Sequence, residues 1–289
     1  MDWKLGIITD EITRDFNAAL DFIRRYDLNW CELRQLWKKN VINLSPSELA
    51  RAKALIRKHH LKVSHIGSPV FKYNLPQVPA RAGEKRDTFL ANFTDQDTDR
   101  LLHKSFRLAR FFGTSKVRVF SYWRAADPEK AYPYVCDRLA KAAALARKND
   151  ILLTLENEHE CNIGTGKELG RLLRDLNSTH LRGLWDGGNA AMLGETPYPD
   201  GYEAVRGLFE HLHVKDVRKN GRTGKLEWAP VGGGLIDWKG QFEALRRDHY
   251  KHTLSLETHY HKRRATKMES TRIALAGLLK IIHETGRPA

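Results

Sequence analysis

Short apolar runs alternate with longer amphipathic stretches along the whole chain. The runs lie at 4–9, 30–33, 61–66, 116–121, 151–156, 181–186, 210–216 and 252–257. Most of them are rich in leucine or β-branched residues, and they are too short to be helices. Runs of this kind are typical of parallel strands that are buried on both faces. We therefore predict eight strands in a parallel sheet.

Helical patterns fill the stretches between these runs. Ser45-Pro46-Ser47-Glu48 combines a capping box with proline at the first helical position, and it predicts a helix to about His60. Further helices are predicted over about 95–112 (which Gly113 can end), from Asp127 to about Lys148, from Asp237 to about Arg247, and over 267–284. Strict alternation of strand and helix predicts an α/β fold, a (β/α)₈ TIM barrel, formed by residues 1–289 as a single domain.

The main alternative to a barrel is an open, doubly wound sheet. Against it, no GxGxxG motif follows the first apolar run. Two connections, 67–94 and 217–236, are longer than the others. Long connections inside a compact domain are usually functional, and in a barrel they lie on the face where the strands end.

Acidic and imidazole side chains stand at the ends of the last four predicted strands. Glu156, Asp186 and Glu257 each end an apolar run. His213 lies near the end of the run at 210–216. The carboxyl ends of barrel strands meet at one rim, where catalytic groups lie. Three converging carboxylates repel one another unless a cation stands between them. Three oxygen donors and one nitrogen suit Mn²⁺, Mg²⁺ or Co²⁺, so we predict one divalent metal ion at these four residues.

Several motifs around these residues resemble those of a known family. LENEHECNIGTG, WDGGNAAMLGETPYPDGYE, HLHVKD, PVGGGLIDW and LSLETH, with CELRQLW and SPVFK earlier in the chain, are similar to the sugar phosphate isomerase/epimerase family. These are xylose isomerase-like TIM barrels that include D-tagatose 3-epimerase and, more distantly, endonuclease IV. The resemblance covers most of the chain. It implies that Glu156, Asp186, His213 and Glu257 are the metal ligands, with Mn²⁺ expected first and Mg²⁺, Co²⁺ or Zn²⁺ as further candidates.

The resemblance also implies a reaction. We expect an isomerase or epimerase that moves a proton next to a carbonyl of a sugar or sugar derivative through an enediolate, with Glu156 and Glu257 as acid and base. A lyase that cleaves a keto-sugar or keto-glycoside by β-elimination is the alternative, because it needs the same metal and base. A non-catalytic sugar-binding barrel and an endonuclease IV-like DNA-repair enzyme are further alternatives. Asn189 stands where the epimerases have a substrate-contacting histidine and where the repair enzyme requires one.

Other polar residues near predicted strand ends are candidates for substrate contact. They are Glu32, Arg34, Lys72, Glu158, Asn189, Lys215 and His259. Asp216 is expected either to orient His213 or Lys215 from behind, or to cap a loop. Arg118 lies inside the fourth run, and burying an arginine without a partner is costly, so we expect it to pair with Glu156 or Glu32.

The charge of the chain changes this picture little. The formal net charge is +14 and the isoelectric point is about 9.7, but the basic residues are spread widely apart from a dense patch at 261–267. We expect a small sugar as the substrate, with an anionic sugar and a homo-oligomer as further possibilities. We do not expect the protein to bind nucleic acid or a membrane. Three separated cysteines and the lack of a signal peptide indicate the cytoplasm.

Overall fold

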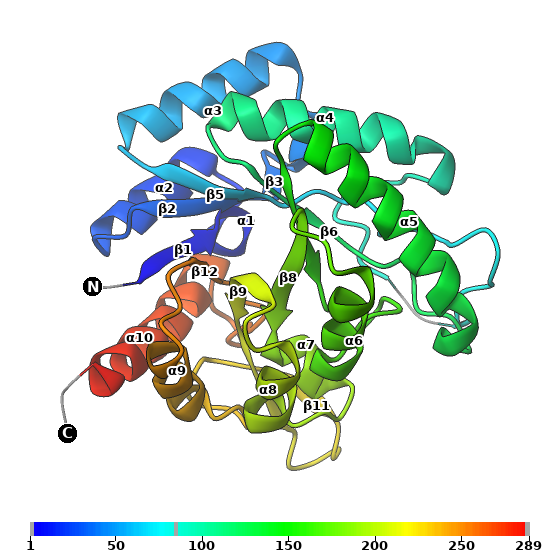
Figure 1. The fold of residues 1–289 in the computed structure, drawn as a ribbon. Helices are drawn as coiled ribbons and strands as arrows, with labels where there is room; N and C mark the ends of the chain where they lie inside the picture. Colours follow the sequence, from blue (N-terminus) through cyan, green and yellow to red (C-terminus); the bar gives the residue numbers. More distant parts are fainter. Residues whose placement is uncertain (1–2, 84–85, 287–289) are drawn as a thin grey trace.

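A closed barrel of eight parallel strands forms the centre of the molecule (Figure 1). The computed structural model describes residues 3–83 and 86–286. The strands follow one another around the barrel as β1-β12-β9-β8-β7-β6-β5-β2. Their bounds are β1 Lys4–Ile8, β2 Trp30–Leu33, β5 Lys62–Ile66, β6 Lys116–Val119, β7 Leu152–Glu156, β8 Leu181–Asp186, β9 Phe209–Val214 and β12 Thr253–Leu256. The predicted TIM barrel is confirmed, and each strand coincides with one apolar run.

Helices surround the barrel (Figure 1). The longer ones are α2 Phe16–Arg25, α3 Pro46–Lys58, α4 Thr98–Phe112, α5 Pro128–Lys148, α6 Gly166–Leu176, α9 Trp238–Arg247 and α10 Lys267–Thr285. Shorter helical segments are α1 Thr9–Ile12, η1 Val41–Asn43, η2 Asp95–Asp97, α7 Gly187–Met192, η3 Pro197–Gly201 and α8 Tyr202–Val205. No helix in the described part of the chain is long and apolar enough to cross a membrane.

The local sequence explains where several helices begin and end. Ser45 and Glu48 form both hydrogen bonds of the predicted capping box at α3. Asp127 and Asp237 each accept a hydrogen bond from a backbone N–H in the first turn of α5 and α9. Gly113 ends α4 with φ of 77°, a left-handed conformation that favours glycine. These four boundaries lie where the sequence predicts them.

Two small hairpins on the barrel were not predicted. One pairs β3 Gln35–Leu36 with β4 Lys39–Asn40, directly after β2. The other pairs β10 Asp216–Lys219 with β11 Leu226–Ala229, inside the connection that the sequence indicated only as a long loop. Both are too short and too polar to stand out as strands in the sequence.

Polar side chains fill the barrel interior. Glu32, His65, Arg118 and His211 are each 0% exposed. Aliphatic residues usually fill this space, and buried polar groups need partners. Two of these residues contact side chains at the strand ends: Glu32 contacts His213, and Arg118 contacts Glu156.

Candidate metal centre and active site

Four side chains converge at the ends of the strands β7, β8, β9 and β12. Glu156, Asp186, His213 and Glu257 each offer one ligand atom, and these atoms all lie within 4.8 Å of one another. Nδ1 of His213 is 3.3 Å from Glu156 Oε1, 3.8 Å from Asp186 Oδ2 and 3.3 Å from Glu257 Oε2. All four residues are at most 1% exposed. The strand ends thus meet as the barrel topology requires.

This group fits a divalent cation. Bonds of about 2.0–2.2 Å to one ion place neighbouring ligand atoms roughly 3.0–3.5 Å apart, close to the separations seen here. Glu156 Oε2 and Asp186 Oδ2 are buried, and each has one charged neighbour, Arg118 Nη1 at 3.1 Å and Lys215 Nζ at 2.9 Å, without hydrogen-bond geometry. Buried carboxylates are costly unless they are fully compensated, and a bound cation would add to that compensation. The donor set is three carboxylates and one imidazole, which suits hard or borderline metals.

Lys215 supplies positive charge to the same carboxylates. Its ammonium lies 2.9 Å from Asp186 Oδ2 and 2.7 Å from Glu257 Oε2. Burial raises the pKa of Asp186 to about 6 although Lys215 opposes this. Burial also disfavours the Glu257 carboxylate, but Lys215 and the nearby histidines outweigh it and hold the pKa of Glu257 well below its usual range. Gly188 makes room for this lysine, because a Cβ there would lie 2.5 Å from Lys215 Cγ.

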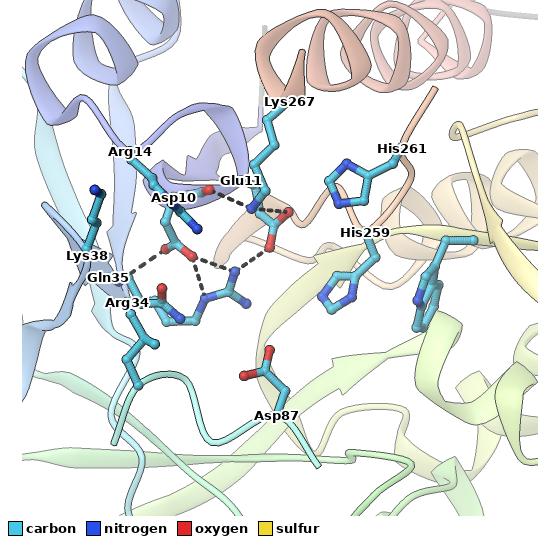
Figure 2. Close-up of a pocket in the computed structure, with 12 residues that line it drawn as sticks. Asp10, Glu11, Arg14, Arg34, Gln35, Lys38, Asp87, His259, His261 and Lys267 are labelled. Atoms are coloured by element: carbon cyan, nitrogen blue, oxygen red, sulfur yellow. Dashed lines mark hydrogen bonds and ion pairs between the residues drawn. The ribbon is translucent and has the colours of Figure 1, made fainter. Parts of the chain in front are cut away.

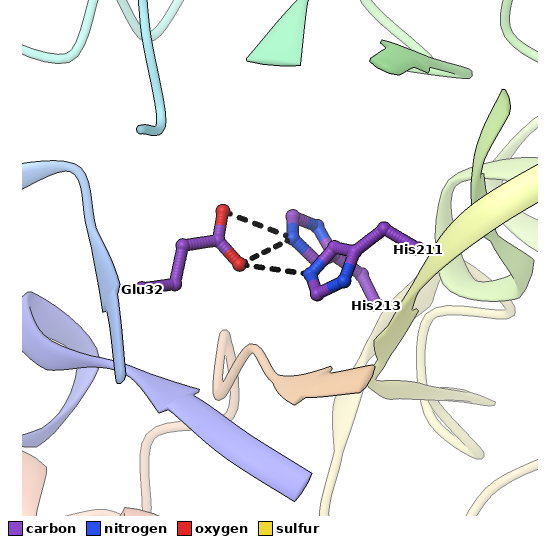
Figure 3. Close-up of side chains that lie close together, drawn as sticks. All are labelled: Glu32, His211 and His213. Carbon is purple, nitrogen blue, oxygen red and sulfur yellow. Dashed lines mark hydrogen bonds and ion pairs between the residues drawn. The ribbon is translucent and has the colours of Figure 1, made fainter. Parts of the chain in front are cut away.

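The Glu32 carboxylate points toward the imidazoles of His211 and His213 (Figure 3). It is 3.1 Å from Nε2 of His213 and 3.0 Å from Nε2 of His211. Burial disfavours the charged form, but the two histidines outweigh it and lower the pKa of Glu32 well below its usual range. The sequence proposed Glu32 for substrate contact, which stays a prediction; in the structure the 0% exposed side chain contacts two imidazoles. A carboxylate on Nε2–H fixes the His213 tautomer that presents Nδ1 to a metal.

Replacing Glu32 with glutamine should weaken metal binding. The amide keeps the shape but loses the charge that holds His213, so we expect affinity for Mn²⁺ to fall roughly 10- to 100-fold. A competition titration against a chelating dye measures this. Glu227→Gln is the matched control, because Glu227 pairs with Arg218 on the exposed hairpin. Equal affinity in folded Glu32→Gln and wild-type protein would show that Glu32 does not set the imidazole.

Arg34 links Glu257 of the metal group to two carboxylates of α1, and Figure 2 shows Arg34 with these two, Asp10 and Glu11. Its guanidinium is 2.7 Å from Asp10 Oδ2 and 2.6 Å from Glu257 Oε1, and it also pairs with Glu11. Burial disfavours the charged form, yet these carboxylates raise the pKa of Arg34 well above its usual range. The structure thus gives Arg34 three carboxylate partners. The sequence proposed this residue for substrate contact, and that role stays a prediction.

Lys72 and Glu158 form a buried pair on the side of β5 and β7. Lys72 Nζ is 3.1 Å from Glu158 Oε2 and 3.6 Å from Glu160 Oε2. The lysine side chain is 1% exposed and its ammonium stands 3.9 Å from the centre of the Phe89 ring. The sequence proposed both residues for substrate contact, and that role stays a prediction.

Asn189 is joined to an imidazole that the sequence analysis missed. Its Oδ1 is 2.9 Å from Nδ1 of His159, and its amide nitrogen donates to the backbone oxygen of Asn157 at 2.9 Å. Glu158 contacts the same His159 nitrogen at 2.8 Å. Burial lowers the pKa of His159, but Glu158 outweighs it and the pKa is raised overall. The one sign of His159 in the sequence is its place three residues after Glu156.

Asp216 caps the loop behind the hairpin. Its carboxylate accepts hydrogen bonds from the backbone N–H groups of Gly232, Gly234 and Ile236 at 3.0, 3.1 and 3.3 Å. The expected contact with His213 or Lys215 is not among its interactions with the described residues, so the loop-capping interpretation fits better. Gly234 is required here, because a Cβ would lie 2.1 Å from Asp216 Oδ1.

A pocket opens beside Glu257. Its volume is about 630 Å³, and Arg34, Trp228 and His259 belong to its wall. Figure 2 shows Arg34 with its acidic partners on one side and His259 and His261 on the other. Nε2 of His259 is 3.2 Å from Glu257 Oε1, and its ring stands 4.9 Å from Trp228. A space of this volume suits a small ligand.

Comparison with known proteins agrees with the architecture. Residues 20–280 match the family model described as xylose isomerase-like TIM barrel. No curated protein matches the chain.

Solved structures of the same fold are similar over nearly the whole chain. The probable 3-DHS dehydratase AsbF from Bacillus anthracis has 17% identity and a TM-score of 0.71, covering 100% of both chains. The IOLI protein with a bound zinc atom has 14% identity and a TM-score of 0.73, covering 98% of this chain and 99% of the other. An L-ribulose 3-epimerase has 16% identity and a TM-score of 0.69, covering 97% and 95%. At these identities the likeness shows the fold.

Proposed function

The chain belongs to the xylose isomerase-like TIM barrel family, and from that premise we propose that it is a metal-dependent isomerase or epimerase of a small sugar or sugar derivative. One observation carries the proposal. Glu156 and Glu257 come from β7 and β12, with β8 and β9 between them, and both lie 3.3 Å from His213 Nδ1. Two carboxylates that flank one centre can remove a proton on one face of a substrate and return it on the other.

The four residues of the metal group would hold one divalent ion. When bound, the ion would supply a Lewis acid that stabilises negative charge on a substrate oxygen. Mn²⁺ is our first candidate, followed by Mg²⁺, Co²⁺ and Zn²⁺. A zinc-bound relative of the same fold supports a metal in this family without fixing its identity here.

The protein's own side chains would do the remaining work. Glu156 and Glu257 exchange protons with the carbon next to the carbonyl. Lys215 stands 2.7 Å from Glu257 and can donate a hydrogen bond to a substrate oxygen at the rim. Asn189 and His259 offer further polar contacts, one beside Glu156 at 3.4 Å and the other beside Glu257 at 3.2 Å. Burial of the centre excludes water and strengthens these interactions.

A lyase is the second candidate. The relative described as a probable 3-DHS dehydratase has the same fold, and β-elimination begins with the same proton removal next to a carbonyl. His159, which contacts both Asn189 and Glu158, would be the extra acid that protonates a leaving hydroxyl.

Deuterium exchange separates these candidates. Protein stripped with a chelator and reloaded with Mn²⁺ would be incubated with a panel of keto-sugars, sugar acids and keto-glycosides in D₂O. NMR and mass spectrometry then follow the products. An epimerase gives a stereoisomer with deuterium next to the carbonyl, whereas a lyase gives an unsaturated product. Absence of both deuterium exchange and an unsaturated product on every substrate, with each of Mn²⁺, Mg²⁺, Co²⁺ and Zn²⁺, would reject both reactions.

A further inference from the structure

Arg118 is buried at the centre of the barrel with most of its hydrogen-bonding capacity unused. The side chain is 0% exposed. Nε, Nη1 and Nη2 donate no hydrogen bond with acceptable geometry to any residue in the described ranges. Among the described residues, its ion-pair partner is Glu156, whose Oε2 is 3.1 Å from Nη1. This confirms the predicted ion pair, but a guanidinium has five N–H donors and a buried donor without an acceptor carries a large penalty.

Glu156 is a poor candidate to satisfy these donors alone. It is one of the four residues of the metal group, so a bound cation would compete for its oxygens. The other neighbours of the guanidinium are aromatic. Its carbon lies 4.6 Å from the centre of the Phe120 ring and 5.1 Å from that of Phe89. Aromatic faces attract a cation but accept no strong hydrogen bond.

A second and a third cation face the same rings. Lys72 Nζ is 3.9 Å from the Phe89 centre and 4.7 Å from the Phe120 centre. Arg34 is 4.8 Å from the Phe89 centre. Three buried cations therefore lie against the Phe89 ring. Arg34 and Lys72 donate hydrogen bonds to carboxylates, whereas Arg118 has its ion pair with Glu156 but no hydrogen bond to a described residue.

We propose that Arg118 binds a carboxylate of the substrate, which makes the substrate a sugar acid or a related hydroxy-acid. The inference rests on the proposed function for the place of the reacting carbon. A carboxylate presents two acceptor oxygens in one plane and matches the fork of a guanidinium. Arg118 holds it next to Glu156, so the carbons that follow the carboxylate lie at the metal group.

The Phe89 side chain covers the Arg118 guanidinium. It comes from the long connection after β5, is 3% exposed, and has φ of 51°, while its neighbour Leu90 has φ of 57°. Residues other than glycine rarely adopt positive φ values. The backbone conformation is therefore strained at two successive residues, Phe89 and Leu90. Leu90 lines the 630 Å³ pocket and is 55% exposed. A ligand in that pocket reaches Arg118 when this segment turns Phe89 aside.

Calorimetric titration with D-gluconate and with its neutral alcohol D-glucitol tests the proposal. Wild-type protein, measured both loaded with Mn²⁺ and stripped of metal, should bind gluconate at least about tenfold more tightly than glucitol. Arg118→Gln should weaken gluconate binding roughly 10- to 100-fold and leave glucitol unchanged. Arg118→Lys should fall between them, because it keeps the charge but not the fork. Arg110→Gln, on the exposed side of α4, is the matched control.

The outcomes are separable from those of the proposed function. Equal binding of gluconate and glucitol by wild type, or an Arg118→Gln variant that keeps full preference for gluconate, overturns the inference even if neutral sugars are epimerised. Gluconate preference that depends on Arg118 supports it even if no turnover is found. Should Arg118→Gln fail to fold, Arg118→Lys decides: a reduced preference for gluconate supports the proposal, and an unchanged preference contradicts it.

Discussion

Turnover should fall roughly 10²- to 10⁴-fold when Glu257 is replaced by glutamine, because the amide cannot accept or return a proton. Glutamine keeps the length of the side chain and one oxygen for a metal. The loss should therefore appear in kcat more than in metal content, which elemental analysis measures on the same sample.

The same variant reveals the direction of proton transfer. With Glu156 intact, one of the two epimers should still exchange its proton with D₂O, while conversion to the other epimer stops. Glu210→Gln is the matched control, because Glu210 lies at the opposite end of β9 and pairs with Lys116. Full turnover by metal-loaded Glu257→Gln would remove Glu257 from the chemistry.

Asp186→Asn should abolish tight metal binding while the fold persists. The charge of this ligand is lost, so we expect affinity for Mn²⁺ to drop by at least about 100-fold, more than for a residue that only orients a ligand. Oδ1 of Asp186 also accepts the backbone N–H of Asn189 at 2.8 Å as the cap of α7, and an asparagine oxygen can do the same. Metal-dependent thermal stabilisation should disappear with the affinity.

Asp237→Asn is the control for this change. Asp237 caps α9 through an equivalent bond to Gly240 at 2.9 Å and takes no part in the metal group. Asp237→Asn should keep the stabilisation that Mn²⁺ gives, and Asp186→Asn alone should lose it. Retained stabilisation in Asp186→Asn would place the ion elsewhere.

The barrel and the convergence of the four residues could be predicted from the sequence. Both depend on the spacing of apolar residues and on the order in which strands and helices follow one another. Eight apolar runs separated by helices determine a closed sheet, and a closed sheet brings the ends of its strands to one rim. Glu156, Asp186, His213 and Glu257 lie together in the structure as that rule requires. Whether they hold a metal, and which one, stays a prediction.

Pairings across the barrel could not be predicted in the same way. Glu32 and His213 are 181 residues apart in sequence, and nothing local to either shows that they touch. Arg34 likewise pairs with Asp10 and Glu11, which both lie in α1 and are more than 20 residues away in the sequence. His159 was missed because its partner Asn189 is 30 residues away. Partners for buried charges are chosen by three-dimensional packing, which a residue pattern does not encode.

The bond between Glu32 and His213 also links metal binding to folding. All four residues of the metal group follow residue 150, in the second half of the chain, yet the imidazole among them is oriented by a carboxylate from β2. A chain in which only the second half had folded would bring the four ligands near one another without fixing His213. We therefore predict that full metal affinity returns during refolding only when the two halves of the barrel have closed.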